Sequence, residues 1–461
     1  AYMVISLALI GLGASGTFLA LMRDRLLPRI AQVYVPCLAL FGPAAVGCYA
    51  LAQQVGFNAE EIFWDLGQLL NLVIIYLLLA VPFFLSGCAI GIALMGWSEN
   101  IPRLYSADLA GAGIGSLALM IALTVVFPLQ ALSLVALVGT CALIVGLWEL
   151  RLRWRPTPAL IFALIALPAL AWPWRAELVV SPYKPLSLAL QTAGAKVLEQ
   201  RTGPLGLLTV VGNKVVPLRH APGLSLYAPV GPPPQLGLYI DAGAVSPITA
   251  WDTTSGPGHF GQLTSALPYY LAHPGRVLVL GAGGGSSVLQ ALALGADQVD
   301  AVELNPQVTA LVRDRFGAFA GDLFRNSRVR LHTGDARGFV TTGRGAYDLI
   351  QLDLIEALGA SAAGLNALGE NYLFTVEAMA DYLRRLSPDG FLAITRWVRV
   401  PPRDALKLLA TAAEALRTTG SSDPGQRIIL IRGWATSTLL VKKTAVTLNE
   451  IRSLRRFCAG G

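Results

Sequence analysis

The sequence contains little charge, few cysteines and few histidines. Charged residues make up 14% of the 461 residues, whereas an average soluble domain contains about 25%. The four histidines are scattered and the five cysteines form no CxxC or Cys/His pattern, so we predict neither a metal site nor a disulfide framework. The net charge of +7 does not indicate nucleic-acid binding, because the basic residues do not alternate with aromatic ones and many lie between apolar segments.

Long apolar segments, all of them before about residue 175, account for the missing charge. Segments of roughly 20 apolar residues are long enough to cross a bilayer as helices. They lie at 2–22, 32–55, 67–96, 104–127, 129–149 and 158–173. We therefore predict a multi-pass α-helical membrane domain over 1–175 with about six spans. The chain starts inside the first apolar segment and stops abruptly at Gly461, so we expect it to be part of a longer protein.

The apolar half offers few candidates for a functional site. Asp108 lies near the start of a predicted span and is a functional candidate, although a cap at a helix N-terminus is the favoured interpretation. Small residues such as Gly111, Gly113 and Gly115 are typical of closely packed membrane helices. A transporter is only weakly supported, because the predicted spans contain no series of buried acids and no broken helices.

After residue 175 the composition becomes that of a soluble α/β protein. Short β-type runs at 207–211 and 238–240, interrupted by turn residues such as Pro232-Pro233-Pro234, predict a small β-subdomain over 176–255. From residue 276, strand-like and helical segments alternate, which predicts a parallel, doubly wound sheet.

The predicted strands of this sheet lie at 276–280, 298–304, 329–333, 347–354 and 391–397, and the predicted helices at 286–294, 306–316, 373–387 and 404–417. Two further strands at 427–431 and 436–441 predict an antiparallel edge hairpin. Rossmann-like methyltransferase folds end in this way. We therefore predict a Rossmann-like domain over 256–461 that binds an S-adenosyl nucleoside beyond the carboxyl ends of its strands.

A glycine-rich turn follows the first predicted strand of this domain. It contains Gly281, Gly283 and Gly285, and Ser286 replaces the last glycine of a dinucleotide-binding fingerprint. A GxGxG turn therefore fits an S-adenosyl ligand better than a pyrophosphate. Glu303, at the end of the second strand, is a carboxylate acceptor for both ribose hydroxyls; the alternative is a solvated acid at a strand end.

Two more groups of polar residues follow the third and fourth strands. Asp335 and Ala336 come after the third strand, where the Asp335 carboxylate would accept a hydrogen bond from the adenine amino group. Asp353 ends the fourth strand, and Glu356 follows three residues later. Carboxylates in this position face the reacting end of the ligand and could hold a cationic amine or take its proton.

In this order, the motifs resemble those of the polyamine aminopropyltransferase (spermidine synthase) family, in particular its bacterial membrane-fused branch. The glycine turn stands where that family has GGGDG, and Glu303 and Asp335 match its ribose- and adenine-binding acids. Asp353 and Glu356 match the two acids of its DSSD segment, the first of which is the base that deprotonates the attacking amine. The resemblance implies a Rossmann-like fold with S-adenosylmethionine or decarboxylated S-adenosylmethionine as the donor.

The predicted substrate pocket departs from the family pattern. Tyr183 and Lys184 belong to a segment that resembles the family's SPYQ motif, with lysine in place of glutamine. A second Tyr-Gln pair corresponds to Phe260-Gly261, and the adjacent Gln262 completes the predicted pocket. The acid of the glycine loop, which holds the donor's amino group in the family, is replaced by Gly284. Two hydrophobic residues, Leu354 and Ile355, replace the small polar residues of DSSD.

Two hypotheses follow from these motifs. The first is a membrane-bound transferase that moves a methyl or aminopropyl group to a small amine or a lipid-side acceptor; the loss of an acid at Gly284 favours a donor that retains its carboxylate. The second is a catalytically degenerate scaffold, an accessory subunit of a membrane complex or a homo-oligomer. For both we predict a location in the bacterial inner membrane, with the soluble domain in the cytoplasm where S-adenosyl nucleosides occur. The basic loops predict the opposite side if all six segments cross.

Overall fold

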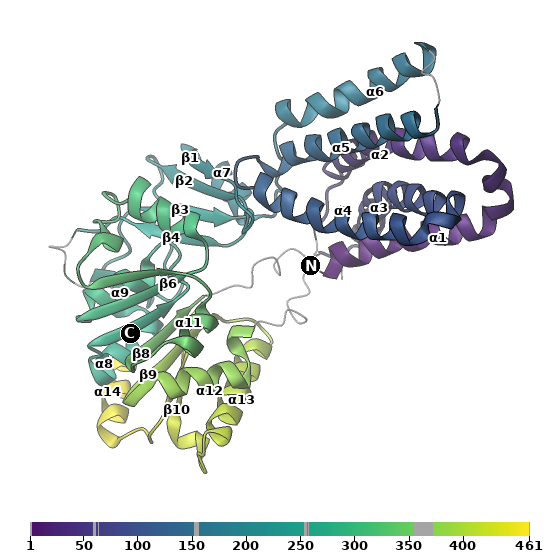
Figure 1. Ribbon diagram of the computed structural model, residues 1–461. Helices are drawn as coiled ribbons and strands as arrows, with labels where there is room; N and C mark the ends of the chain where they lie inside the picture. The colour runs from purple at the N-terminus through teal and green to yellow at the C-terminus, as the bar shows by residue number, and fades with distance from the viewer. Residues whose placement is uncertain are drawn as a thin grey trace. The chain divides into compact units, whose positions relative to one another are not determined.

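The structure is a computed structural model that describes residues 2–58, 61–62, 64–151, 156–252, 256, 258–354 and 372–460. The chain forms two compact units, which are described separately (Figure 1). The first contains Ala1–Ser187 and Arg201–Leu207, and the second contains Leu188–Gln200 and most of the chain from Leu208 onwards.

The first unit is built from long apolar helices. They are α1 (Tyr2–Leu26), α2 (Ile30–Ala52), α3 (Leu66–Gly96), α4 (Ile101–Ala122), α5 (Pro128–Glu149) and α6 (Pro156–Arg175). Four stretches are long and apolar enough to cross a membrane, namely Val4–Ala52, Leu66–Gly96, Ser98–Ala122 and Pro128–Glu149. The first of these stretches contains both α1 and α2. The membrane location itself stays a prediction, which is taken up below.

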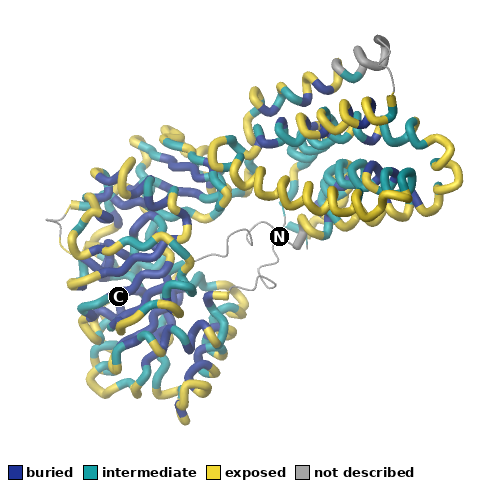
Figure 2. The backbone as a smooth tube through the Cα atoms, in the orientation of Figure 1, coloured by how far each residue is buried: buried dark blue, intermediate teal, exposed yellow. Residues whose placement is uncertain are grey.

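Packing between these helices depends on small residues and apolar side chains. A Cβ atom at Gly42 of α2 would lie 2.9 Å from the Ala136 carbonyl oxygen of α5, so the glycine permits close contact between the two helices. By contrast, α4 has no buried residue (Figure 2). Its N-cap is Asn100, so the interpretation of Asp108 as a helix cap is wrong.

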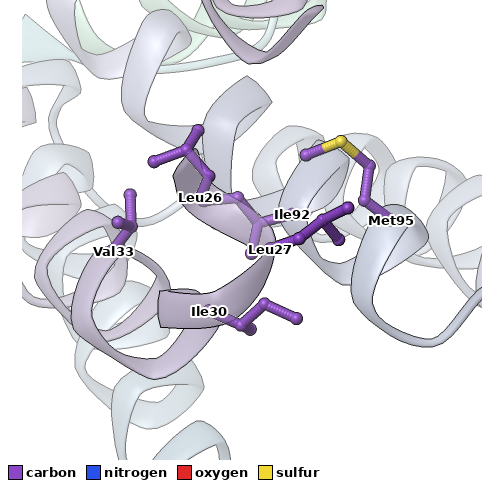
Figure 3. Close-up of a pocket in the computed structure, with 6 residues that line it drawn as sticks. All are labelled: Leu26, Leu27, Ile30, Val33, Ile92 and Met95. Carbon is purple, nitrogen blue, oxygen red and sulfur yellow. The ribbon is translucent and has the colours of Figure 1, made fainter. Parts of the chain in front are cut away.

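A shallow pocket lies where the end of α1, the start of α2 and the end of α3 meet (Figure 3). Its lining residues are all apolar: Leu26, Leu27, Ile30, Val33, Ile92 and Met95. Because these side chains offer no hydrogen-bonding group, the pocket has none of the features of a nucleoside site.

The division between the two units falls within helix α7 (Pro185–Gln191), and the second unit continues with a four-stranded sheet. The strands β1 (Ala195–Arg201), β2 (Leu208–Asn213), β3 (Gln235–Ile240) and β4 (Val245–Thr249) lie side by side in chain order. The pairs β2–β3 and β3–β4 are antiparallel. The strands lie within the range predicted for a small β-subdomain.

A seven-stranded sheet forms the rest of the second unit. Its strands are β5 (Arg276–Leu280), β6 (Gln298–Glu303), β7 (Val329–Thr333), β8 (Tyr347–Asp353), β9 (Leu386–Trp397), β10 (Ile428–Arg432) and β11 (Thr436–Lys442). They are ordered β10-β11-β9-β8-β5-β6-β7. The strands β5 to β9 are parallel, and β11 is antiparallel to both β9 and β10. The predicted strands and the edge hairpin are therefore present.

Helices cover both faces of this sheet. One face is covered by α8 (Leu267–Ala272), α9 (Ser286–Ala293), α10 (Pro306–Ala310) and α14 (Leu448–Ala459), and the other by α11 (Ala336–Thr342), α12 (Val376–Arg385) and α13 (Arg403–Thr418). Alternate residues of β5 enter the two cores: Val277 belongs to one and Leu278 to the other. A strand buried on both faces is expected to be apolar throughout, which explains its sequence.

Candidate functional site

The predicted ligand-binding residues lie after four neighbouring parallel strands, β8, β5, β6 and β7. The glycine turn follows β5, Glu303 ends β6, Asp335 comes two residues after β7 and Asp353 ends β8. The Gly334 N–H donates to the Glu303 backbone oxygen at 2.9 Å, which joins the ends of β6 and β7. After β5, the strands β6 and β7 are added on one side of it, and β8 is then added on the other side. The boundary between β5 and β8 is therefore a topological switch point, which is where open α/β sheets bind ligands.

The glycine turn uses all of its own N–H groups in hydrogen bonds. Gly281, Gly283 and Gly285 have φ angles of 78°, 51° and 94°, which L side chains rarely adopt. The five N–H groups of residues 281–285 donate, in chain order, to Val302 O at 2.9 Å, Val302 O at 3.0 Å, Glu303 Oε2 at 2.9 Å, Ser246 Oγ at 2.8 Å and Ala282 O at 2.8 Å. The turn therefore leaves no backbone N–H of these five residues to bind an anion.

Strand β4 packs directly against this turn. A Cβ atom at Gly284 would lie 2.3 Å from the Pro247 carbonyl oxygen and 3.0 Å from that of Ser246. The Ser286 hydroxyl also donates to the Pro247 oxygen at 3.2 Å. An acidic side chain therefore does not fit at position 284 in this backbone, which accounts physically for the glycine found there.

Glu303 is buried, with 9% of its surface exposed, and both carboxylate oxygens are held by backbone groups. Oε2 accepts from Gly283 N and Oε1 from Asn305 N, each at 2.9 Å. A carboxylate has about four acceptor positions, so these two bonds orient the group and leave further acceptor capacity. The interpretation of Glu303 as a solvated acid is wrong, since it is part of the turn's own structure.

Asp335 is exposed and caps helix α11. Its Oδ1 accepts from Gly338 N at 2.6 Å, and its Oδ2 accepts from the Tyr372 hydroxyl, also at 2.6 Å. The bond to Asp335 and partial burial raise the pKa of Tyr372 to about 12, so this tyrosine remains a donor. Ala336 is the first residue of the capped helix. The adenine-binding role of both residues stays a prediction.

Asp353 has two carboxylate oxygens in different surroundings. Oδ2 accepts from the Ser287 hydroxyl at 2.7 Å and from the Gln351 amide. Oδ1 is buried and has no hydrogen-bond partner among the described residues. Burial raises the pKa of this carboxyl group, and the side chains of Ser287, Thr395 and Gln351 oppose that effect. A carboxyl group with a raised pKa and a free oxygen is suited to accept a proton.

The residues of the predicted substrate pocket are distributed over both units. Tyr183 and Lys184 belong to the first unit and Gln262 to the second, and Gln262 accepts through its backbone oxygen from Ser225 N at 2.9 Å. Phe260 is 2% exposed and belongs to the core. Glu356 lies outside the described residues. Roles for these residues in binding an acceptor stay predictions.

Several polar residues of the site were not predicted. Ser246 bonds the glycine turn, Ser287 and Gln351 bond Asp353, and the Tyr269 hydroxyl donates to Gln351 Oε1 at 2.7 Å. One signal was available in the sequence. Gln351 is a large polar residue between the buried apolar residues Ile350 and Leu352, and a buried amide requires partners.

Comparisons with known proteins are consistent with this geometry. Residues 258–396 match the family model described as the spermine/spermidine synthase domain. The polyamine aminopropyltransferase of Korarchaeum cryptofilum is 30% identical over 125 residues, which are 27% of this chain and 36% of that relative. The corresponding protein of Clostridium acetobutylicum is 33% identical over 119 residues, 25% of this chain and 38% of that relative. The chain thus spans little more than a third of these relatives.

Among solved structures, a spermidine synthase in complex with the transition state analogue AdoDATO aligns with a TM-score of 0.37 and 14% identity, over 57% of this chain and 78% of that chain. A probable spermidine synthase from Corynebacterium glutamicum aligns with a TM-score of 0.39 and 18% identity, over 58% of this chain and 88% of that chain.

The sheet order and the antiparallel β11 define a Rossmann-like domain of the methyltransferase type. Within that class, residues 258–396 are similar to the spermine/spermidine synthase domain. The matches therefore support a transferase of the aminopropyl type. They are less specific for a methyltransferase, and they do not favour the hypothesis of a non-catalytic scaffold.

Proposed function

We propose that this protein is a membrane-bound aminopropyltransferase that uses decarboxylated S-adenosylmethionine as the donor and an amine as the acceptor. The observation that carries the proposal is the glycine turn, in which all five N–H groups of residues 281–285 already have acceptors. The match to the spermine/spermidine synthase domain supports the same conclusion.

The occupied turn favours a donor without a carboxylate. S-adenosylmethionine carries a carboxylate, which needs N–H donors or a cation when it is removed from water. Decarboxylated S-adenosylmethionine lacks that group and carries only positive charge. Glu303, Asp335 and Asp353 provide acceptors and negative charge, which suit a hydroxyl-rich cation. This reverses the preference that the loss of an acid at Gly284 suggested from the sequence.

The residues of this chain would act on the acceptor amine. The neutral amine nitrogen uses its lone pair to form a bond to the aminopropyl carbon attached to sulfur. The carbon–sulfur bond breaks and its electron pair stays on sulfur, which leaves neutral 5′-methylthioadenosine. The proton lost by the nitrogen goes to the Asp353 carboxylate. Alignment of the two reactants supplies much of the rate, because the sulfonium is already an activated leaving group.

The apolar helices support attachment to a membrane. Four stretches have the length and composition needed to cross a bilayer, and we assign them to the bacterial inner membrane. The spermidine synthase-like domain would face the cytoplasm, where the donor occurs. The acceptor would be a small amine or an amine at the lipid surface, and assembly into a homo-oligomer or a larger membrane complex remains compatible with this function.

The test is to measure donor binding and product formation with the purified full chain in detergent. We expect calorimetry to give tighter binding of decarboxylated S-adenosylmethionine than of S-adenosylmethionine, and we expect a diamine to release 5′-methylthioadenosine. Asp353→Asn should bind the donor but transfer about 100-fold or more slowly, as expected for loss of a general base. Failure to bind either nucleoside, or formation of S-adenosylhomocysteine instead, would refute the proposal.

A further inference from the structure

Asp353 is connected to a chain of buried amide groups that runs into the core. Gln351 is fully buried on β8, and Gln290, on α9, is 1% exposed. The Gln351 Nε2 donates to Gln290 Oε1 at 2.8 Å and also to Asp353 Oδ2. Buried polar groups are unfavourable unless they are hydrogen-bonded. A functional role would explain why two glutamines occupy these buried positions.

A backbone carbonyl fixes the direction of the hydrogen bonds between these buried amide groups. The Gln290 Nε2 donates to the Phe260 carbonyl oxygen at 3.0 Å, and a carbonyl oxygen only accepts. The opposite atom of that amide, Gln290 Oε1, must therefore be the acceptor for Gln351. Gln351 consequently presents its NH2 group, and its second N–H faces Asp353.

Two further hydroxyl groups support the same orientation. The Ser265 hydroxyl donates to Gln290 Oε1 at 3.0 Å, and the Tyr269 hydroxyl donates to Gln351 Oε1 at 2.7 Å. Burial and the charge of Asp353 raise the pKa of Tyr269 well above its ordinary value, so Tyr269 stays protonated and can donate. Reversal of the Gln351 amide would place its oxygen against the Asp353 carboxylate and against the Gln290 oxygen.

We propose that Gln290 and Gln351 are positioning residues that hold Asp353 Oδ2 as a hydrogen-bond acceptor and thereby assign Oδ1 as the atom that takes the proton from the acceptor amine. Oδ2 receives two donors, from Ser287 and Gln351, whereas Oδ1 is buried and has no hydrogen bond to the residues that the structure describes. The Thr395 side chain also interacts with this carboxyl group. The inference about amine deprotonation rests on the proposed function. The inference about ionisation of Asp353 rests on the contacts alone.

Four side chains in the described part of the chain interact electrostatically with the Asp353 carboxyl group. Gln351 lies on the same strand, Ser287 belongs to α9, Thr395 to β9 and Tyr269 to α8. Among these residues of the described structure, Tyr269 is the titratable one, and it is neutral. The Ser287 hydroxyl, the Thr395 side chain and the Gln351 amide N–H all oppose the effect of burial on the pKa of Asp353, and Gln351 is the one of the three that the buried amides orient.

The test replaces Gln351 by leucine and follows the pH dependence of kcat/KM. Loss of the donor raises the pKa of Asp353, so the acidic limb should move to higher pH by about one unit, since a hydrogen bond to a charged group is worth roughly a tenfold change or more. Gln290→Leu should shift it in the same direction by less. It is the second variant in case Gln351→Leu does not fold.

Gln235 provides a matched control. It is a glutamine on β3 with 3% exposure, and its Nε2 donates to Thr249 Oγ1 at 3.0 Å, but it is not connected to Asp353 by the described contacts. Gln235→Leu removes a buried amide without changing the donors to Asp353. An equal shift of the acidic limb in Gln235→Leu, or no shift in Gln351→Leu and Gln290→Leu, would overturn the proposal.

A second readout does not depend on catalysis. The infrared C=O band of the protonated Asp353 carboxyl group, identified by its loss in Asp353→Asn, is titrated in the wild-type chain and in Gln351→Leu. A shift to higher pH in the variant supports the inference about ionisation even if no group transfer is found, in which case only the proposed function fails. An unchanged titration overturns the inference.

Discussion

At the scale of single residues, Asp353, the proposed base, lies in surroundings that are unfavourable for stability. Its Oδ1 is buried without a hydrogen-bond partner in the described part of the chain, and burial raises the pKa of the carboxyl group. A carboxyl group in such surroundings binds a proton more tightly in the folded chain than in the unfolded one. Functional groups often lie in environments of this kind, where stability is lower than a different residue would give.

Replacement of Asp353 by asparagine should therefore increase thermal stability at neutral pH. A raised pKa in the folded state means that stability falls as pH rises from the ordinary carboxyl pKa through the raised value. The amide does not ionise, so the variant should have a higher Tm than the wild type at pH 7, and the difference should diminish towards pH of about 4. Thermal denaturation at a series of pH values measures this.

Asp348, on the same strand, is the control for this experiment. Its carboxylate accepts from Arg276 N and from the Ser387 hydroxyl, each at 2.9 Å. Asp348→Asn weakens bonds to an anion that already has partners, so its Tm should decrease at pH 7. A lower Tm for Asp353→Asn at neutral pH as well would contradict the argument about its buried oxygen.

At the scale of secondary-structure elements, β4 closes one side of the glycine turn. The Ser246 hydroxyl is the acceptor for Gly284 N, and the Pro247 carbonyl oxygen accepts from Ser286. A strand of the small sheet thus completes the hydrogen bonds of a turn in the large one. Selection between donors with and without a carboxylate should depend on this strand as well as on the turn.

Replacement of Ser246 by alanine tests this role. The variant leaves the Gly284 N–H without its acceptor, so this group becomes available to a ligand carboxylate. We expect the affinity for S-adenosylmethionine relative to decarboxylated S-adenosylmethionine to rise roughly fivefold, the value of one ordinary hydrogen bond. Calorimetry with both nucleosides measures the ratio, and Ser246→Thr, which keeps the hydroxyl, is the control. A ratio that is the same in all three proteins would contradict the prediction.

The elements could largely be predicted from the sequence because most of them follow local patterns. Each of the parallel strands β5 to β8 ends in an acid or is followed by a glycine, and each lies within a residue of its predicted range. Helix α11 was not predicted, although Asp335 is a typical N-cap residue and accepts from Gly338 N. Helix α14 was also missed, despite the capping box formed by Thr447 and Glu450.

The contacts within the site could not be predicted in the same way, because they join residues that are distant in the chain. Gln351 is separated by 61 residues from Gln290 and by 82 from Tyr269, and Ser246 lies 38 residues before Gly284. Spacing along the chain predicts which strand ends approach one another. It does not indicate which buried side chains then pair.

At the scale of the whole molecule, the two units differ in how much of their apolar surface is exposed. The second unit has an apolar core beneath polar residues, whereas the helices of the first expose many large apolar side chains, among them Leu21, Leu77 and Ile114. Exposed apolar surface of this extent is unfavourable in water and favourable in lipid. This contrast fits the proposal of a transferase domain that apolar helices attach to a bilayer.

Extraction of membranes tests this assignment. We expect the full chain to sediment with membranes, to resist alkaline carbonate and to require detergent for release, because several apolar helices must leave the lipid together. A peripheral membrane protein in the same preparation, which carbonate should release, serves as the control. Release of the full chain by carbonate would show that the helices do not cross the bilayer.

The Phe260 carbonyl has a consequence for how this protein tolerates sequence change. Every amino acid carries a main-chain oxygen, so the atom that orients the two amides persists whatever side chain occupies position 260, provided that the local backbone is kept. A different side chain at position 260 would alter packing, but it would not reverse the direction in which Gln290 and Gln351 donate their hydrogen bonds. The vulnerable positions are instead 290 and 351. At 351, a change from glutamine to glutamate replaces the NH2 group that donates to Asp353 by an oxygen, which competes with Asp353 for the same proton. At 290, the same change places an oxygen against the Phe260 carbonyl oxygen.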